Sequence, residues 1–303
     1  MSSASLEERR LPRPRTYLAG RPDRPDLVGK ALRSSADAIF LDFEDAVPAA
    51  ARATAREALI EVLGEAPLTK PVLVRCNRLD HPDGPLDLEA AVRAGSRSVI
   101  FPKTRDPEEI VTAEKAIAQV EATLDLAAGT VGLWVMVETA AAVDNLDAIL
   151  RASSGIEGVF LGPGDLSLDL GVPMIDGDRV QLDHPILRWC HMRVAVTARA
   201  HGVRQIMTAA YERNQDLDEV RDCSLRAFGM GYTAVEIQSP RHVDVVHEAH
   251  RPTAETLQHA KAVVVAYEGA VAAGEGLVIV GDQGVQRPGY EAALDTLAKQ
   301  RTA

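Results

Sequence analysis

Cysteine, basic residues and long apolar runs are all scarce in this sequence. Its three cysteines, Cys76, Cys190 and Cys223, are widely spaced and form no CxxC pattern. This excludes a disulfide framework and indicates buried, reduced thiols in a cytoplasmic protein. No apolar run approaches ~18 residues, so we expect no membrane span. The opening segment, MSSASLEERRLPRPR, lacks the apolar core of a signal peptide.

Basic residues are outnumbered, with 33 Lys and Arg against 44 Asp and Glu and a formal net charge of −11. Sequence-independent nucleic-acid binding and polybasic membrane contact both need a positive face. We therefore expect neither nucleic acid nor a membrane as a partner, and we interpret the excess acid as a solvated surface.

Eight short apolar segments alternate with segments of helical spacing between Arg15 and about His250. They are nearly continuous in apolar residues, which is typical of parallel strands covered on both faces. The predicted strands are Thr16 to Leu18, Ala38 to Asp42, Val72 to Cys76, Ser98 to Phe101, Gly132 to Val137, Gly158 to Leu161, Arg204 to Met207 and Ala234 to Ile237. This α/β pattern predicts a (β/α)₈ TIM barrel, and an open doubly wound sheet is the alternative.

Helix signals support the same order of elements. Asp106 followed by Pro107 offers an N-cap and a proline at the first helical position. Further helices are predicted from Pro185 to Ala200 and from Leu217 to Phe228, each followed by a glycine.

The pattern changes after Arg251-Pro252. A long helix, Thr253 to Ala273, leads to the strand–turn–strand stretch GEGLVIVGDQGVQRP and a last helix from Tyr290. We therefore predict a TIM-barrel catalytic domain over residues 1–251 and a C-terminal helical and hairpin extension over 252–303. This extension is a lid over the barrel mouth or an arm that packs on a neighbouring subunit.

Two acidic residues, Glu138 and Asp165, each follow an apolar run and stand 27 positions apart, in LWVMVETAAAV and GVFLGPGDLSLDLG. Two carboxylates at neighbouring strand ends can share one hard divalent cation, which is how Mg²⁺ is usually placed beside an anionic substrate. Taken singly, Glu138 can also be a solvated loop residue and Asp165 an Asx cap of its turn.

Charged residues also follow three other predicted strands, at the end where barrel enzymes carry their reactive groups. They are Asp42, Glu44 and Asp45 where the second strand ends, Arg75 with Asn77 where the third ends, and Lys103 after the fourth. A purely structural barrel has no need for five such strand ends. The alternative for Arg75 is a structural ion pair with Asp42 or Glu44.

In order and spacing these segments resemble the HpcH/HpaI aldolase and citrate lyase β-subunit family, in particular its CoA-ester lyase branch. The matching motifs are RTYLAGRPD, FLDFEDAVP, VRCNRLD, FPKTRDPEEI, MVETAAAV and GPGDLSLDLG. The resemblance implies a TIM barrel, a Mg²⁺ ion held by Glu138 and Asp165 with waters, and Arg75 on the substrate oxygens. It also implies that Glu44 and Asp45 orient Arg75 or hold a metal-bound water, and that Arg15, Lys103 and Gly164 contribute to substrate binding.

The sequence departs from the family pattern in two places. EIQSPRH has Gln238 where the CoA-ester lyases usually carry a histidine, and GDQGVQRP has Gln286 where their lid usually carries an acid/base aspartate. Because glutamine cannot exchange a proton at neutral pH, thioester hydrolysis is the step that these changes put in question. Asp45, where the HpaI branch carries a catalytic histidine, favours the CoA-ester branch.

The resulting hypothesis is a Mg²⁺-dependent carbon–carbon lyase that acts through an enolate on a short 3-hydroxyacyl-CoA or a related carboxylic acid. One alternative is an HpaI-type aldolase on free 4-hydroxy-2-oxo acids, which GPGDLSLDLG favours. Another is a catalytically silent scaffold that keeps the metal pocket. By resemblance, we expect a homotrimer or homohexamer in which the extension covers a neighbour's site.

Overall fold

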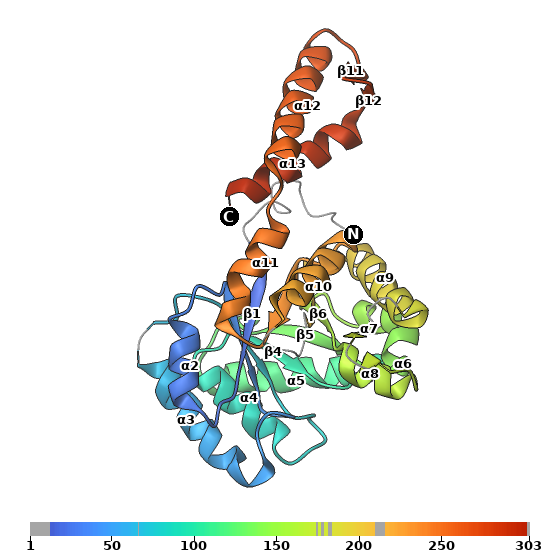
Figure 1. The fold of residues 1–303 in the computed structure, drawn as a ribbon. Helices are drawn as coiled ribbons and strands as arrows, with labels where there is room; N and C mark the ends of the chain where they lie inside the picture. The colour runs from blue at the N-terminus through green and yellow to red at the C-terminus, as the bar shows by residue number, and fades with distance from the viewer. Residues whose placement is uncertain are drawn as a thin grey trace. The chain divides into compact units, whose positions relative to one another are not determined.

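Eight parallel strands close into a barrel in the order β1-β10-β9-β6-β5-β4-β3-β2. This computed structural model describes residues 13–65, 67–173, 175–176, 179–180, 184–209 and 216–301, so most of the opening segment discussed above lies outside the described residues. Helices surround the barrel, as Figure 1 shows. The predicted (β/α)₈ fold is therefore confirmed, and the open sheet is wrong because β1 pairs with both β2 and β10.

The strands fall close to the predicted segments. The barrel consists of β1 (Thr16–Gly20), β2 (Ala38–Asp42), β3 (Val72–Arg75), β4 (Ser98–Phe101), β5 (Gly132–Val137), β6 (Ile156–Leu161), β9 (Gln205–Ala209) and β10 (Ala234–Ile237). A two-stranded antiparallel pair, β7 (Ile175–Asp176) and β8 (Arg179–Val180), follows β6 and its helix and was not predicted.

Helices connect consecutive barrel strands and cover the outside of the sheet. They are α2 (Pro25–Leu32), α3 (Arg52–Gly64), α4 (Gly84–Arg93), α5 (Pro107–Thr123), α6 (Ala140–Asp144), α7 (Leu146–Arg151), α8 (Pro163–Asp169), α9 (Pro185–Ala200) and α10 (Leu217–Gly229), with 3₁₀ turns η1 (Ala49–Ala51) and η2 (Pro240–His242). The Asp106 side chain accepts hydrogen bonds from the amides of Glu108 and Glu109, which confirms the predicted N-cap of α5.

Large side chains fill the inside of the barrel and confine any ligand to its mouth. Tyr17 meets Trp134 edge to face with ring centroids 5.5 Å apart, and Phe40 meets Phe160 in the same way at 5.5 Å. The Trp134 ring fits because Gly158 has no side chain; a Cβ atom there would lie 2.5 Å from the ring. A TIM barrel is a packed core rather than a pore, and this one follows the rule.

The chain divides into two compact units, one of residues Arg13–Val246 and one that includes His247–Ala303. The helix α11 (Val243–His250) crosses this boundary, and the second unit continues with α12 (Ala254–Ala272), the antiparallel hairpin β11 (Val278–Val280) and β12 (Gln283–Val285), and α13 (Arg287–Arg301). The predicted helix–hairpin–helix order is thus present, although the last helix starts at Arg287 rather than Tyr290. Its role as a lid stays a prediction.

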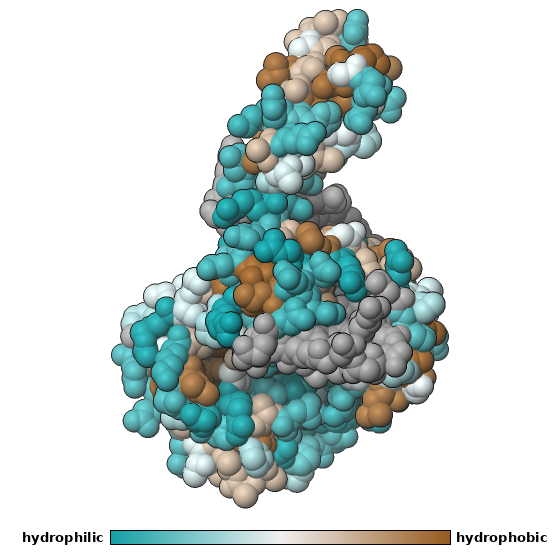
Figure 2. Space-filling model, in the orientation of Figure 1, coloured by the Kyte–Doolittle hydropathy of each residue, from teal (hydrophilic) through white to brown (hydrophobic). Residues whose placement is uncertain are grey.

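A small core holds the second unit together. Tyr267 of α12 stacks on Tyr290 of α13, with ring centroids 5.0 Å apart, and Val263 and Val285 are buried beside them. Leu277 and Ile279 of the hairpin are exposed, and apolar residues show at that end of the unit in Figure 2. Among the described residues, no helix combines the length and apolarity needed to cross a membrane.

Candidate active site

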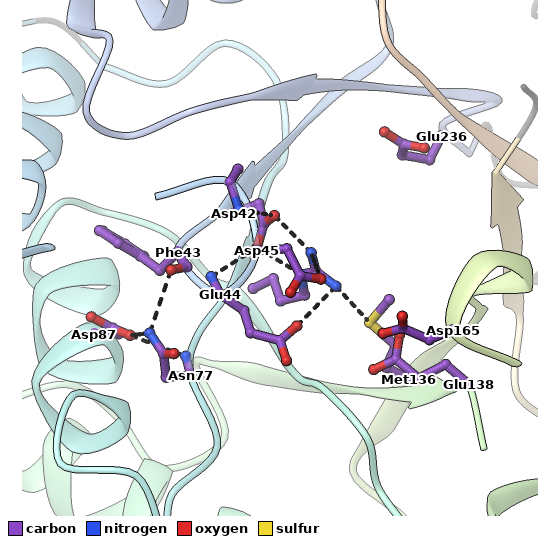
Figure 3. Close-up of polar contacts among 12 residues, drawn as sticks. Asp42, Phe43, Glu44, Asp45, Asn77, Asp87, Met136, Glu138, Asp165 and Glu236 are labelled. Carbon is purple, nitrogen blue, oxygen red and sulfur yellow. Dashed lines mark hydrogen bonds and ion pairs between the residues drawn. The ribbon is translucent and has the colours of Figure 1, made fainter. Parts of the chain in front are cut away.

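The strand order explains why charged residues from five loops meet. Strands β2, β3, β4, β5 and β6 are consecutive neighbours in the barrel, and all run in the same direction. Their carboxyl ends therefore form one continuous arc of the mouth. Figure 3 shows the residues of this arc, with Asp42, Glu44 and Asp45 on one side and Glu138 and Asp165 on the other.

Arg75, the last residue of β3, is the centre of this arc. Asp42 pairs with it through two hydrogen bonds, from Nε at 2.6 Å and from Nη2 at 2.7 Å, and Asp45 accepts from Nη2 at 2.9 Å. Glu44 Oε2 lies 3.0 Å from Nη1. Although burial lowers the pKa of the guanidinium, its bond to Asp42 and the surrounding carboxylates outweigh this and raise the pKa. Arg75 therefore keeps its charge and one fixed orientation.

One nitrogen of Arg75 has capacity to bind a substrate. Nη1 donates to the Sδ atom of Met136 at 3.8 Å. A thioether is a weak acceptor, so a substrate oxygen is the better partner for this N–H. The ion pairs expected as the alternative for Arg75 do exist: Asp42 takes Nε and Nη2, and Glu44 Oε2 lies 3.0 Å from Nη1, the nitrogen that also faces Met136.

Asp42 also shapes the loop that carries its neighbours. Its two carboxylate oxygens accept hydrogen bonds from the amides of Glu44 at 2.9 Å and Ala46 at 3.0 Å. These bonds hold the loop after β2 so that Glu44 and Asp45 both reach Arg75. Asn77, which follows β3, donates to the fully buried Asp87 of α4 at 2.7 Å.

Lys103 joins the two sides of the arc. Its backbone has φ of 53°, a left-handed conformation that is uncommon for a residue with a side chain. Its amide donates to Glu138 Oε1 at 2.7 Å. Its ammonium lies 2.8 Å from Glu44 Oε1 and 3.4 Å from Asp165 Oδ2. One residue therefore contacts three of the predicted site carboxylates.

Glu138 follows β5 and is almost completely buried, with 2% of its surface exposed. Burial raises its pKa to about 7, and the charge of Arg75 acts in the opposite direction. Burial also raises the pKa of Glu44, against the charges of Arg75 and Lys103. Both carboxyl groups are thus desolvated, and a bound cation would favour their charged forms.

Asp165 enters the site from the first turn of α8, whose start is set by Gly162 and Pro163. Gly162 lies against Glu138: a Cβ atom there would be 2.9 Å from Oε2 and 3.2 Å from the Cβ of Glu138. Gly164 has open space where its Cβ would be. The two glycines of this turn therefore differ: a side chain at Gly162 would meet Glu138, whereas one at Gly164 would meet no described atom within 4 Å.

The donor set fits a hard divalent cation. Five carboxyl groups line this part of the mouth against two cations. The buried Oε2 of Glu44 forms an ion pair with Arg75 Nη1 at 3.0 Å but accepts no hydrogen bond from the described residues. Within those residues, no three His, Cys, Asp or Glu side chains form a ready-made metal cluster. Mg²⁺ usually keeps several waters and takes one or two carboxylates, so Glu138 and Asp165 are the residues that would hold it.

Other predicted residues lie elsewhere. Arg15 precedes β1, at the amino end of the barrel, and pairs with Asp37 at 3.0 Å; the structure does not bring it to the group around Arg75. The three cysteines are free and buried, and burial raises the pKa of the Cys76 thiol.

Sequence reasoning missed Glu236 of β10. It is buried, and its Oε1 accepts from Gln238 at 2.5 Å. It belongs to the inward face because it lies two residues after Ala234, which packs inside the barrel. Because alternate residues of a strand share a face, the two-residue spacing between Ala234 and Glu236 was the sequence signal for an inward-facing carboxylate on this strand.

The chain is similar to known proteins in sequence and in fold. The family model described as HpcH/HpaI aldolase/citrate lyase matches residues 16–240. Citrate lyase subunit beta of Escherichia coli K12 is 27% identical over 99% of this chain and 97% of the relative. A (3S)-malyl-CoA thioesterase of Cereibacter sphaeroides is 28% identical over 93% and 92%. A citrate lyase beta subunit of Mycobacterium tuberculosis, solved with oxaloacetate and magnesium, is 25% identical with a TM-score of 0.67, covering 80% of this chain and 99% of that one.

Proposed function

The chain belongs to the HpcH/HpaI aldolase/citrate lyase family, and from that membership and the barrel mouth we propose that it is a Mg²⁺-dependent carbon–carbon lyase. Its substrate is a short 3-hydroxyacyl-CoA or a related carboxylic acid. The relatives named above include a citrate lyase subunit and a malyl-CoA thioesterase, so carbon–carbon cleavage and thioester hydrolysis are the two activities to separate.

The observation that carries the proposal is the orientation of Arg75 between two acidic groups. Asp42 and Asp45 take Nε and Nη2, whereas Nη1 donates its hydrogen bond to the weak acceptor Met136 Sδ and lies 3.0 Å from Glu44 Oε2. Cleavage beside a carbonyl leaves negative charge on oxygen, as an enolate. A guanidinium already fixed in place stabilises this charge without reorganising. Removing one such donor typically lowers the rate by about 10²–10³.

The carboxylates have distinct tasks in this proposal. Glu138 and Asp165 hold the Mg²⁺ ion, which supplies a Lewis acid for the substrate carbonyl when it is bound. Glu44 and Asp45 act on the substrate through Arg75 and are therefore positioning residues. The packed side chains below the mouth, among them Met136 and Phe160, exclude water from one side of the reacting atoms.

The CoA ester is the favoured form of the substrate. Asp45 stands where a free-acid aldolase of this family carries its histidine, and here it binds Arg75 at 2.9 Å instead of acting as a base. Gln286 stands at the place of the lid aspartate, so we propose that the protein cleaves a carbon–carbon bond and does not hydrolyse the thioester. Assembly as a trimer or hexamer, with residues 252–303 as the lid, belongs to the same proposal.

The test uses malyl-CoA, the ester named for the relatives, with and without Mg²⁺. Carbon–carbon cleavage releases acetyl-CoA and glyoxylate, whereas hydrolysis releases free CoA and malate. Pyruvate released from a 4-hydroxy-2-oxo acid, with no CoA-ester binding, would identify the free-acid aldolase instead.

Two variants assign the metal. Glu138→Ala should lose both Mg²⁺ binding and turnover. Glu89→Ala, which removes an exposed carboxylate of α4, should keep both. Activity that survives in Glu138→Ala would exclude this metal assignment.

A further inference from the structure

We propose that the ammonium of Lys103 competes with the metal ion for Asp165. Without the metal the ammonium contacts both Glu44 and Asp165, and it releases Asp165 when Mg²⁺ binds. The inference rests on the proposed function, since it concerns the same metal site. It differs from the substrate-binding role expected for Lys103 from the resemblance.

The geometry of Lys103 is specific. The ammonium lies between two carboxylates from opposite sides of the arc, 2.8 Å from Glu44 and 3.4 Å from Asp165. These two residues come from the loop after β2 and from α8, which follows β6, and β3, β4 and β5 lie between these two strands in the barrel. A cation that contacts both fixes their separation and reduces their mutual repulsion.

The left-handed backbone of Lys103 makes this arrangement possible. At φ of 53° the amide points to Glu138 while the side chain reaches Glu44 and Asp165. A non-glycine residue in this region is strained, and such strain persists where the surroundings hold it. The same residue thus touches both proposed metal ligands, one through its amide and the other through its ammonium.

The two contacts have opposite consequences for a metal ion. The amide leaves the charge of Glu138 in place and holds the carboxylate in one orientation, which favours binding. The ammonium shares Asp165 with any incoming cation, so Mg²⁺ must replace a contact that already exists. An ion pair between partly exposed groups shifts an equilibrium by roughly two- to fivefold. Because this ammonium contacts two site carboxylates, we expect an effect of about three- to tenfold.

The experiment measures Mg²⁺ affinity by calorimetry in the full chain. Lys103→Met removes the ammonium and keeps the amide, and it should bind Mg²⁺ about three- to tenfold more tightly than the unchanged protein. Lys103→Gly should bind equally tightly and also relieve the strained backbone, so its folding does not depend on a side chain at φ of 53°. A residue with a merely structural role would give weaker binding on removal, and this sign separates the two roles.

Arg105→Met is the matched control. Arg105 is two residues away and pairs with Glu109 at 3.2 Å, so the variant changes the net charge equally without touching Glu44 or Asp165. Its Mg²⁺ affinity should stay within about twofold, because exposed charges at a distance are screened. The inference about Lys103 is wrong if Lys103→Met binds Mg²⁺ as tightly as the unchanged protein or more weakly. It is also wrong if Arg105→Met gains as much affinity as Lys103→Met, and in each of these cases the proposed function still stands. No Mg²⁺ binding in any of these proteins would overturn the proposed function with it.

Discussion

Adding one methyl group at Gly162 should impair metal binding much more than it impairs folding. The Cβ of Gly162→Ala would lie 2.9 Å from Glu138 Oε2, 3.1 Å from the Met136 Cε and 3.2 Å from the Glu138 Cβ. Normal contacts of this kind are near 3.4 Å or more, so the Glu138 carboxylate must move by a few tenths of an ångström. The backbone itself accepts alanine, because φ of Gly162 is −87°.

The magnitude follows from what holds Glu138. Its carboxylate accepts the Lys103 amide at 2.7 Å and is nearly fully buried, so it cannot move without disturbing that bond. Perturbing the support of a metal ligand typically costs about 10- to 100-fold in affinity. Adding a methyl group to a packed site costs about 1–3 kcal/mol in stability, and the flexible end of Glu138 places Gly162→Ala near the lower limit.

The assay is calorimetric titration with Mg²⁺, together with urea unfolding of the same proteins. Gly164→Ala is the matched control, because no atom of the described residues lies within 4 Å of its added Cβ. It should bind Mg²⁺ like the unchanged protein. Wild-type affinity in Gly162→Ala, or an equal loss in Gly164→Ala, would refute the placement of the metal beside Glu138.

Three further predictions concern other parts of the molecule. Asp42→Asn should lower the free energy of unfolding by about 3–5 kcal/mol in urea, because it removes the charge of the carboxylate that binds buried Arg75 through two hydrogen bonds. Asp45→Asn removes a single contact of a half-exposed carboxylate and should cost less than about 1 kcal/mol. Burial lowers the pKa of His191 from 6.5 to about 4, so between these pH values the unfolded chain binds a proton that the folded chain does not, and the free energy of unfolding falls with the pH. Between pH 7.5 and pH 5 this loss is about 2 kcal/mol, and His191→Leu should lose about 2 kcal/mol less than the unchanged protein over the same range. Light scattering should find a trimer or hexamer, and a monomer would contradict the assignment of residues 252–303 as an intersubunit lid.

The barrel was predictable because its strands are covered on both faces. That burial makes Ala38–Asp42 and Gly132–Val137 nearly continuous apolar runs, which are recognisable without knowledge of their neighbours. Strand direction then places the residues after each run at one end. The same rule places Arg15, which precedes β1, at the other end, and the structure finds it there with Asp37.

The contacts within the site could not be predicted in the same way. Which carboxylate takes which nitrogen of Arg75 depends on the curve of the loop after β2, which Asp42 sets through two backbone amides. The left-handed turn at Lys103 has no sequence signal, because lysine does not favour it. The difference between Gly162 and Gly164 is set by the closeness of Gly162 to Met136 and Glu138, so it appears only in three dimensions.

The most direct test of the central claim is calorimetric titration of the protein with acetyl-CoA and, separately, with pyruvate, each with and without Mg²⁺. We predict Mg²⁺-dependent binding of pyruvate, lost in Glu138→Ala, together with binding of the CoA ester. Pyruvate binding that is the same with and without Mg²⁺, or unchanged in Glu138→Ala, would contradict the account of a metal-assisted lyase.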